Sequence, residues 1–254
     1  MRTHATTTYI GTYIRMFVLL LLSALFVYFV PFVGGDALDS FLTFNASNIG
    51  ILYAITIGFL MMIAINRKQL LDSSISLEIN KIRRMHHLAL NLHKVTPGTD
   101  AWYKALDTAI KDYLKGFDKR DFLHYEEGNA AARKMTYAIY SLPQITSEYN
   151  SELYQFLIEA AGDITEAREN IRATTDASIG YFQWFVTIVM TLLLAVIVVI
   201  DAPYALLTRV LTGVVVFNLF LMLQLIYEYD QTNPKKRRYY IELYLQNVKA
   251  MIKP

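Results

Sequence analysis

Residues 46–66, ASNIGILYAITIGFLMMIAIN, form an apolar stretch with small residues four apart from Ala46 to Gly58 and an asparagine near each end. A helix of roughly 20 apolar residues is long enough to cross the hydrocarbon core of a bilayer. No charged residue interrupts this stretch. It therefore predicts a transmembrane helix over about residues 48–65, followed directly by the basic pair Arg67 and Lys68.

Two faces of this helix differ in character. Four small residues are spaced four apart, which allows a second helix to approach closely in lipid. We expect this series to be a helix-packing face: Ala46, Gly50, Ala54 and Gly58. A second face, centred about 130° away at about 100° per residue, is an apolar stripe with polar ends. We expect it to line a pore, and its residues are Asn48, Ile51, Leu52, Ile55, Phe59, Met62 and Asn66.

The alternative for the apolar part of the stripe is simple contact with lipid or other spans. The two asparagines favour a surface that faces protein or water, because amides need hydrogen-bond partners within hydrocarbon. If several copies surround an axis, Ile55, Phe59 and Met62 become a narrow apolar neck. Such a neck can gate by dewetting.

Three further apolar blocks have transmembrane length, at about residues 14–33, 182–200 and 206–227. Hydrophobic residues make up 54% of the 254 residues, more than a soluble domain usually carries. The first block exceeds a signal-peptide core and has no small-x-small cleavage site before Asp36. The expected fold class is thus an all-α integral membrane protein with four transmembrane helices.

Basic residues flank the spans on one side. Lys and Arg accumulate in short cytoplasmic segments of membrane proteins. Here they are Arg2 and Arg15 before the first span, Arg67, Lys68, Lys81, Arg83 and Arg84 after the second, and Lys235, Lys236, Arg237 and Arg238 after the fourth. The segment that joins the first two spans holds Asp36 and Asp39 and no basic residue. We expect a multi-pass protein of the cell or inner membrane with both termini cytoplasmic.

Residues 67–178, between the second and third spans, predict a helical cytoplasmic block, since breakers occur only at 97–98, 116, 128, 143 and 162. The second span should continue as a helix to about Leu92, another helix should cover 119–142, and 147–176 should lead straight into the third span. This gives a helical stalk. The expected divisions are 1–66 with two spans, 67–178 cytoplasmic, 179–228 with two spans, and 229–254 cytoplasmic.

Several function classes lack a basis in the sequence. The chain has no cysteine, which excludes disulfides and thiolate chemistry. His86 and His87 point about 100° apart on a helix, so we expect solvated side chains and no metal site. No phosphate loop, nucleophile elbow or zincin motif is present, and we expect neither an enzyme nor a cofactor. The basic residues lie beside the spans, which indicates membrane lipids rather than nucleic acid as partners.

Two short segments carry a family resemblance: residues 65–68, Ile-Asn-Arg-Lys, leading to Glu78, and residues 167–172, Ala-Arg-Glu-Asn-Ile-Arg, before the third span. Together with the four-span layout they resemble bestrophin-like membrane proteins, in particular the small bestrophin-related family of unknown function. The resemblance implies a homo-oligomeric ion channel, pentameric as in bestrophins, with small inorganic ions passing an apolar neck on the second span. It favours anions, chloride among them.

The chain also departs from bestrophins proper. It lacks paired tryptophans after the second span, and its acidic residues near position 120 are interleaved with basic ones, so calcium gating is not expected. Asp201 and Arg209 near the outer side and Arg67 near the inner side leave ion sign open. The alternative function is a non-conducting membrane-anchored sensor or scaffold that acts through its cytoplasmic helices. A transporter is the weaker hypothesis, because no predicted span carries an acidic residue.

Overall fold

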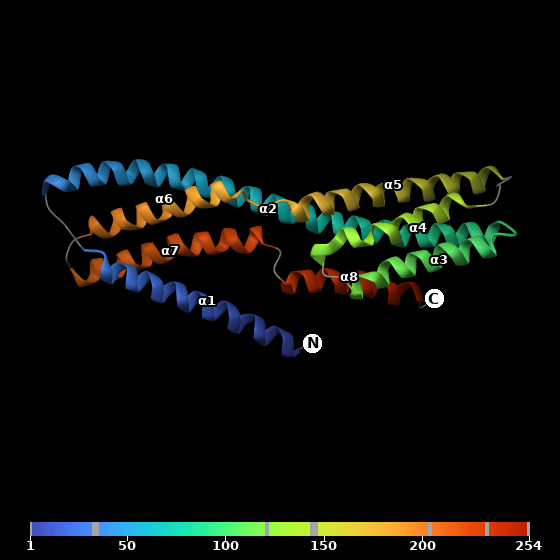
Figure 1. The fold of residues 1–254 in the computed structure, drawn as a ribbon, viewed down its shortest axis with the longest axis horizontal. Coiled ribbons are helices and arrows are strands. Elements are labelled where there is room, and N and C mark those ends of the chain that lie inside the picture. Colours follow the sequence, from blue (N-terminus) through green and yellow to red (C-terminus); the bar gives the residue numbers. More distant parts are fainter. Residues whose placement is uncertain are drawn as a thin grey trace. The chain divides into compact units, whose positions relative to one another are not determined.

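The structure of the protein, a computed structural model, describes residues 2–31, 36–119, 122–142, 147–202, 205–231 and 234–252. Over these residues it is built of α-helices and short 3-10 helices, without strands, as predicted. The chain divides into two compact units. Unit 1 comprises residues 1–65 and 179–231, and unit 2 comprises residues 66–178 and 232–254. Helix α2 (Asp36–Val95) supplies residues to both (Figure 1).

Unit 1 contains α1 (Arg2–Phe29), the first part of α2, α6 (Tyr181–Ile200) and α7 (Leu206–Asp230). Both α1 and α6 pack against α7. Large apolar side chains remain exposed on these helices, for example Phe182 at 77% and Leu206 at 81%. A helix that is apolar on nearly all sides is typical of a membrane span, so the exposed surface of unit 1 is suited to lipid.

Among the described residues, three helices are long and apolar enough to cross a membrane: Ser47–Val95, Tyr181–Ile200 and Leu206–Asp230. The apolar part of α1, Ile14–Phe29, is shorter. Residues 32–33 of the predicted first span lie outside the described residues, as do the side chains of Asp36 and Asp39. The count of four spans therefore stays a prediction.

Unit 2 combines the rest of α2 with α3 (Asp100–Lys115), η1 (Gly116–Lys119), η2 (Phe122–Gly128), α4 (Asn129–Tyr140), α5 (Glu148–Asp176) and α8 (Pro234–Ile252). Helix α3 packs against both α4 and α8. The core holds fully buried aliphatic side chains on α2 and α3, among them Ile82, Leu92, Leu106 and Ile110. A core of this kind gives unit 2 its own hydrophobic stabilisation.

Helix α8 is tied to α2 by polar contacts as well. The Tyr240 hydroxyl donates to the Asp72 carboxylate, and the Arg83 guanidinium donates to Asn247. Lys236 Nζ lies 3.2 Å from Asp72. These contacts hold α8 against α2 within unit 2. The partners are far apart in the chain: 164 positions separate Lys236 from Asp72.

The predicted continuation of the second span is confirmed, because α2 is unbroken from Asp36 to Val95. Its end lies just before Pro97, which cannot donate a helical hydrogen bond. Gly98 follows with φ of 78°, a left-handed conformation that suits glycine. The sharp turn there allows α3 to begin at Asp100.

Two predictions about the helices after Pro97 are wrong. The predicted helix over 119–142 is α-helical only from Asn129, after two 3-10 segments, with His124 at the non-helical angles φ −98° and ψ 41°. The predicted direct passage into the third span fails because α5 ends at Asp176 and α6 begins at Tyr181. Ala177 and Gly180 between them are extended.

A hydrogen-bond acceptor on α7 explains this second interruption. The backbone N–H of Ile179 donates to Asp230 Oδ1 at 2.9 Å, and Trp184 Nε1 donates to Asp230 Oδ2 at 3.3 Å. Ile179 is itself buried in the core of unit 1. A side chain from a distant helix thus satisfies the N–H that a continuous helix would bond internally.

Candidate functional site

The predicted pore stripe lies on an uncovered face of α2. The exposed fractions are 60% for Ile51, 58% for Leu52, 65% for Ile55, 57% for Phe59 and 51% for Met62. Asn48 and Asn66 are exposed as well. No helix described in unit 1 covers this apolar surface, so in a single chain it is free to meet lipid, water or another copy.

The predicted helix-packing face is also uncovered. Ala54 and Gly58 are exposed and Gly50 is half-buried. A Cβ atom added at Gly50 or Gly58 would meet no atom within 4 Å. The side chain of Ala46 lies outside the described residues. Within the described chain this small-residue series is not a contact between helices.

A third face of α2, which sequence reasoning missed, makes the contacts within the chain. Tyr53, Ile57, Leu60 and Ala64 are buried in a cluster with residues of α6 and α7. Their spacing of three to four residues is helical. In a helix that is apolar on all sides, this spacing does not stand out from its neighbours. The available signal was Tyr53, because a hydroxyl within an apolar span needs a hydrogen-bond partner. In the structure this hydroxyl lies 3.5 Å from the Leu219 carbonyl oxygen.

A buried polar cluster in unit 2 centres on Glu78 of α2, whose side chain is fully buried. Its carboxylate accepts hydrogen bonds from three tyrosine hydroxyls, those of Tyr113 on α3, Tyr125 on η2 at 2.6 Å, and Tyr244 on α8. Arg168 Nη1 on α5 lies 3.5 Å from the same carboxylate. Five separate elements therefore meet at one side chain. We call these five residues the Glu78 cluster.

The guanidinium of Arg168 is held in several ways. Its Nη1 donates to the Tyr113 hydroxyl, and its Nη2 donates to Asn129 Oδ1 at 2.6 Å. It also lies over the rings of Tyr113 and Tyr125, at 5.0 Å and 4.8 Å from the centroids. Cation–π contacts of this kind gain strength when water is excluded. The charge of Arg168 is thus compensated by both a carboxylate and aromatic faces.

The electrostatics of the cluster keep the tyrosines as donors. Burial raises the pKa of Tyr113, Tyr125 and Tyr244 well above 10.0, and negative neighbours, Glu78 among them, raise it further. Burial by itself would lower the pKa of Arg168, but the tyrosine oxygens and Glu78 leave it raised on balance. The three phenols therefore stay protonated at neutral pH and remain hydrogen-bond donors. The arrangement is suited to holding helices together.

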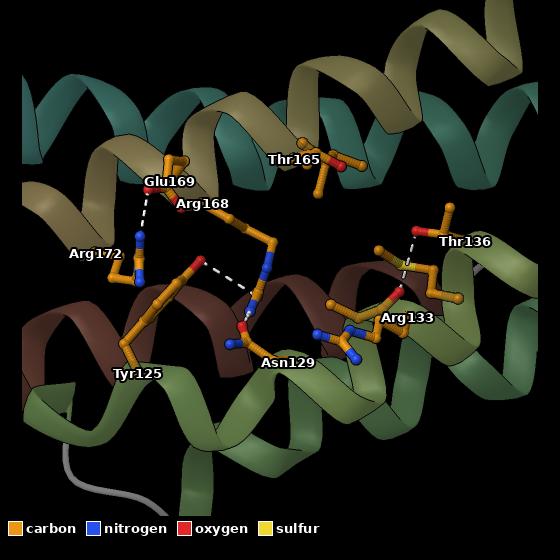
Figure 2. Close-up of a pocket in the computed structure, with 11 residues that line it drawn as sticks. Tyr125, Asn129, Arg133, Thr136, Thr165, Arg168, Glu169 and Arg172 are labelled. Atoms are coloured by element: carbon orange, nitrogen blue, oxygen red, sulfur yellow. Dashed lines mark hydrogen bonds and ion pairs between the residues drawn. The ribbon is translucent and has the colours of Figure 1, made fainter.

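Next to this cluster, α4 and α5 line a cavity of about 320 Å³ that is open to the surface beside the exposed residues Arg133 and Arg172 (Figure 2). Figure 2 shows the side chain of Arg168 on α5 pointing toward Asn129 on α4, with Arg172 to one side of it and Arg133 to the other. Tyr125, Thr136, Thr165 and Glu169 complete the polar part of the wall. Among the described residues, no group of three or more His, Asp or Glu side chains is placed to hold a metal ion.

The histidines occur in other surroundings. His86 Nε2 lies 3.2 Å from the Asp107 carboxylate, and burial lowers the pKa of His86 although Asp107 opposes this. The ring of His93 stacks on Tyr103 with centroids 4.9 Å apart. The expectation of solvated side chains is wrong for His86, which is 6% exposed. Its position three residues before the core residue Ala89 was the signal for burial.

Membrane-length helices in one unit, and a second helical unit with a buried polar centre, define a helical membrane protein. Residues 16–241 match the family model of the Bestrophin-like domain. The chain belongs to the bestrophin-like family, as the two short segments had indicated.

Solved structures share this fold. A bacterial Bestrophin homolog from Klebsiella pneumoniae, carrying a single substitution, aligns with a TM-score of 0.72 at 12% identity, over 94% of this chain and 100% of that chain. A second crystal structure, of a chain described as a membrane protein, gives the same TM-score and identity over 94% and 99%. Another substituted Klebsiella homolog aligns with a TM-score of 0.67. No curated protein matches the sequence.

Proposed function

We propose that the chain is one subunit of a homo-oligomeric ion channel whose pore is lined by α2. The observation that carries this proposal is the asymmetry of α2 in unit 1. Its Tyr53 and Ile57 face is buried against α6 and α7, whereas Ile55 and Phe59 remain more than half exposed. An apolar face without an intrachain partner, on a helix with a second uncovered seam, is suited to assembly around an axis.

In this assembly Ile55, Phe59 and Met62 form the apolar neck, and Asn48 and Asn66 form its polar flanks. Water leaves a narrow apolar constriction readily, which stops ions until the neck widens. Ile51 and Leu52 line the wider part beside Asn48. The exposed small residues Ala54 and Gly58, with Gly50, provide the contact between neighbouring copies.

The subunit number and the ion type are proposed from the family resemblance. Bestrophin resemblance favours a pentamer and small anions such as chloride. The basic residues beside the spans favour cytoplasmic termini and contact with anionic lipid headgroups. Unit 2 is then the cytoplasmic domain of a multi-pass protein.

Ion flux from proteoliposomes tests the proposal. The purified chain should form oligomers in detergent and pass chloride, and Phe59→Ala should raise the flux because it widens the neck. Phe185→Ala is the matched control, since Phe185 is 64% exposed on α6 and outside the stripe. Its flux should equal that of the wild type.

Two results would count against conduction through α2. A strictly monomeric chain has no ring of α2 helices. Oligomers that release no ion, with or without Phe59→Ala, would favour the membrane-anchored sensor or scaffold instead.

A further inference from the structure

The cavity between α4 and α5 has the size and lining of a small-molecule site. Its volume of about 320 Å³ lies at the lower end of the range of ligand pockets, roughly 300 to 1,000 Å³. The buried side chains of Ala132, Met135 and Ile164 form the apolar part of its surface. A compact molecule with a short apolar body fits this space.

Two polar rows face each other across the cavity. Helix α4 presents Asn129, Arg133 and Thr136, and α5 presents Thr165, Arg168 and Arg172. Residues spaced three or four apart lie on one face of a helix, so each row points into the same space (Figure 2). Three guanidinium groups and one carboxylate, that of Glu169, line the cavity.

The three guanidinium groups differ in how far they are already satisfied. Arg168 is committed to the Glu78 cluster and to Asn129. Arg172 pairs with Glu169 and, at 3.2 Å, with Glu126. Arg133 forms no hydrogen bond or ion pair with any side chain that the structure describes. The cavity therefore offers one cation that lacks an anionic partner.

We propose that this cavity binds a small organic anion through a terminal carboxylate or phosphate group. Arg133 holds the oxyanion, because a guanidinium offers paired donors that match either group. The amide nitrogen of Asn129 is left to donate as well, since Arg168 occupies its Oδ1 at 2.6 Å. The body of the ligand covers Met135 and Ile164. This site is independent of the pore and adds a ligand-binding role to unit 2.

The ligand lies against Arg168 and so touches the Glu78 cluster. Arg168 Nη1 lies 3.4 Å from the Tyr125 hydroxyl and also contacts the Glu78 carboxylate. An oxyanion beside Arg168 would share the guanidinium with these two groups. Binding should therefore also change the thermal stability of unit 2. The effect provides a second readout that does not depend on ion conduction.

Calorimetric titration of the purified full-length chain tests the proposal, with malonate and inorganic phosphate as probes at constant ionic strength. We expect saturable binding of at least one probe at one site per chain. Arg133→Gln should weaken it by about tenfold or more, because one charge-assisted contact is lost. Comparison of the two probes shows which oxyanion is preferred.

Lys134→Gln is the matched control, because Lys134 is the next residue on α4, is exposed, and does not line the cavity. Its affinity should stay within about twofold of the wild type. Absence of saturable binding for both probes would overturn the proposal. An equal loss in both variants would do so too, since it would indicate only a general effect of positive charge.

Discussion

Glu78 and Arg168 stand 90 positions apart in the chain, yet Arg168 Nη1 lies 3.5 Å from the Glu78 carboxylate inside unit 2. Glu78 is fully buried and Arg168 is 9% exposed. A buried charge without its partner is strongly destabilising, although an intact buried pair adds little by itself. The pair therefore acts as a constraint: each residue requires the other, and α2 and α5 stay in register.

Arg168→Met should destabilise unit 2 by about 3–5 kcal/mol, because it leaves the Glu78 charge buried without a cation. Thermal unfolding in detergent, followed by circular dichroism, measures this effect. Arg172→Met, one turn further along α5, removes an exposed arginine and should leave the unfolding temperature nearly unchanged. Equal losses in the two variants would contradict the role assigned to the buried pair.

Tyr244→Phe isolates one hydrogen bond of the cluster. The phenylalanine ring keeps the stack on Phe117, whose centroid lies 3.9 Å away, but loses the hydroxyl that donates to Glu78. We expect a loss of about 1–3 kcal/mol, as for an unsatisfied buried acceptor. Tyr239→Phe, an exposed position on the same helix, serves as control and should be neutral. A neutral Tyr244→Phe would mean that the hydroxyl is dispensable.

Stability should fall in alkali. The folded chain keeps the protons of Tyr113, Tyr125 and Tyr244 because burial raises their pKa well above the ordinary 10.0, at which the unfolded chain releases them. Their contribution is complete below about pH 10 and is lost as pH rises further. Unfolding temperatures measured from about pH 8 to about pH 11 should decline less steeply in Tyr244→Phe than in the wild type. Parallel curves would contradict this.

Gly58→Leu tests the seam between copies. Because a Cβ at Gly58 meets no atom within 4 Å, the fold of one chain has room for the larger side chain. In an oligomer packed along this series the leucine blocks close helix approach, and we expect dissociation on size-exclusion chromatography with light scattering. Gly213→Leu on α7, where a Cβ also meets no atom within 4 Å, should leave the oligomer intact. Unchanged mass in both would place the interface elsewhere.

The parts of the fold that sequence predicts best are those with a strong local pattern. Residues 46–66 show apolar length directly, and the helical spacing after them predicts that the helix continues to about Leu92, close to the end of α2 at Val95. Contacts over long sequence distances leave no such pattern. Glu78 and the segment 167–172 were singled out by resemblance, but nothing in either predicts that they meet.

The features that the sequence does not predict also depend on contacts between residues far apart in the chain. The interruption at Ala177–Gly180 has only Gly180 as a local signal. Its other contact is with Asp230, whose carboxylate lies 51 positions from Ile179 in the chain. The buried face at Tyr53 and Ile57 is hidden because its neighbours on α2 are equally apolar. The cavity around Arg133 exists only when α4 and α5 are side by side. Tertiary contacts, not propensities, decide each of these.

The most direct test of the pore on α2 uses the absence of cysteine from the chain. Single cysteines at Ile55, Phe59 and Met62 can be treated with a charged, water-soluble thiol reagent while chloride flux from proteoliposomes is recorded. Leu211→Cys on α7 is the control, since Leu211 is 57% exposed and outside the stripe. We predict that the reagent changes flux in the three stripe variants and leaves Leu211→Cys unaffected. Flux that the reagent leaves unchanged at all three stripe positions, in vesicles that do conduct, would contradict a pore lined by this face of α2.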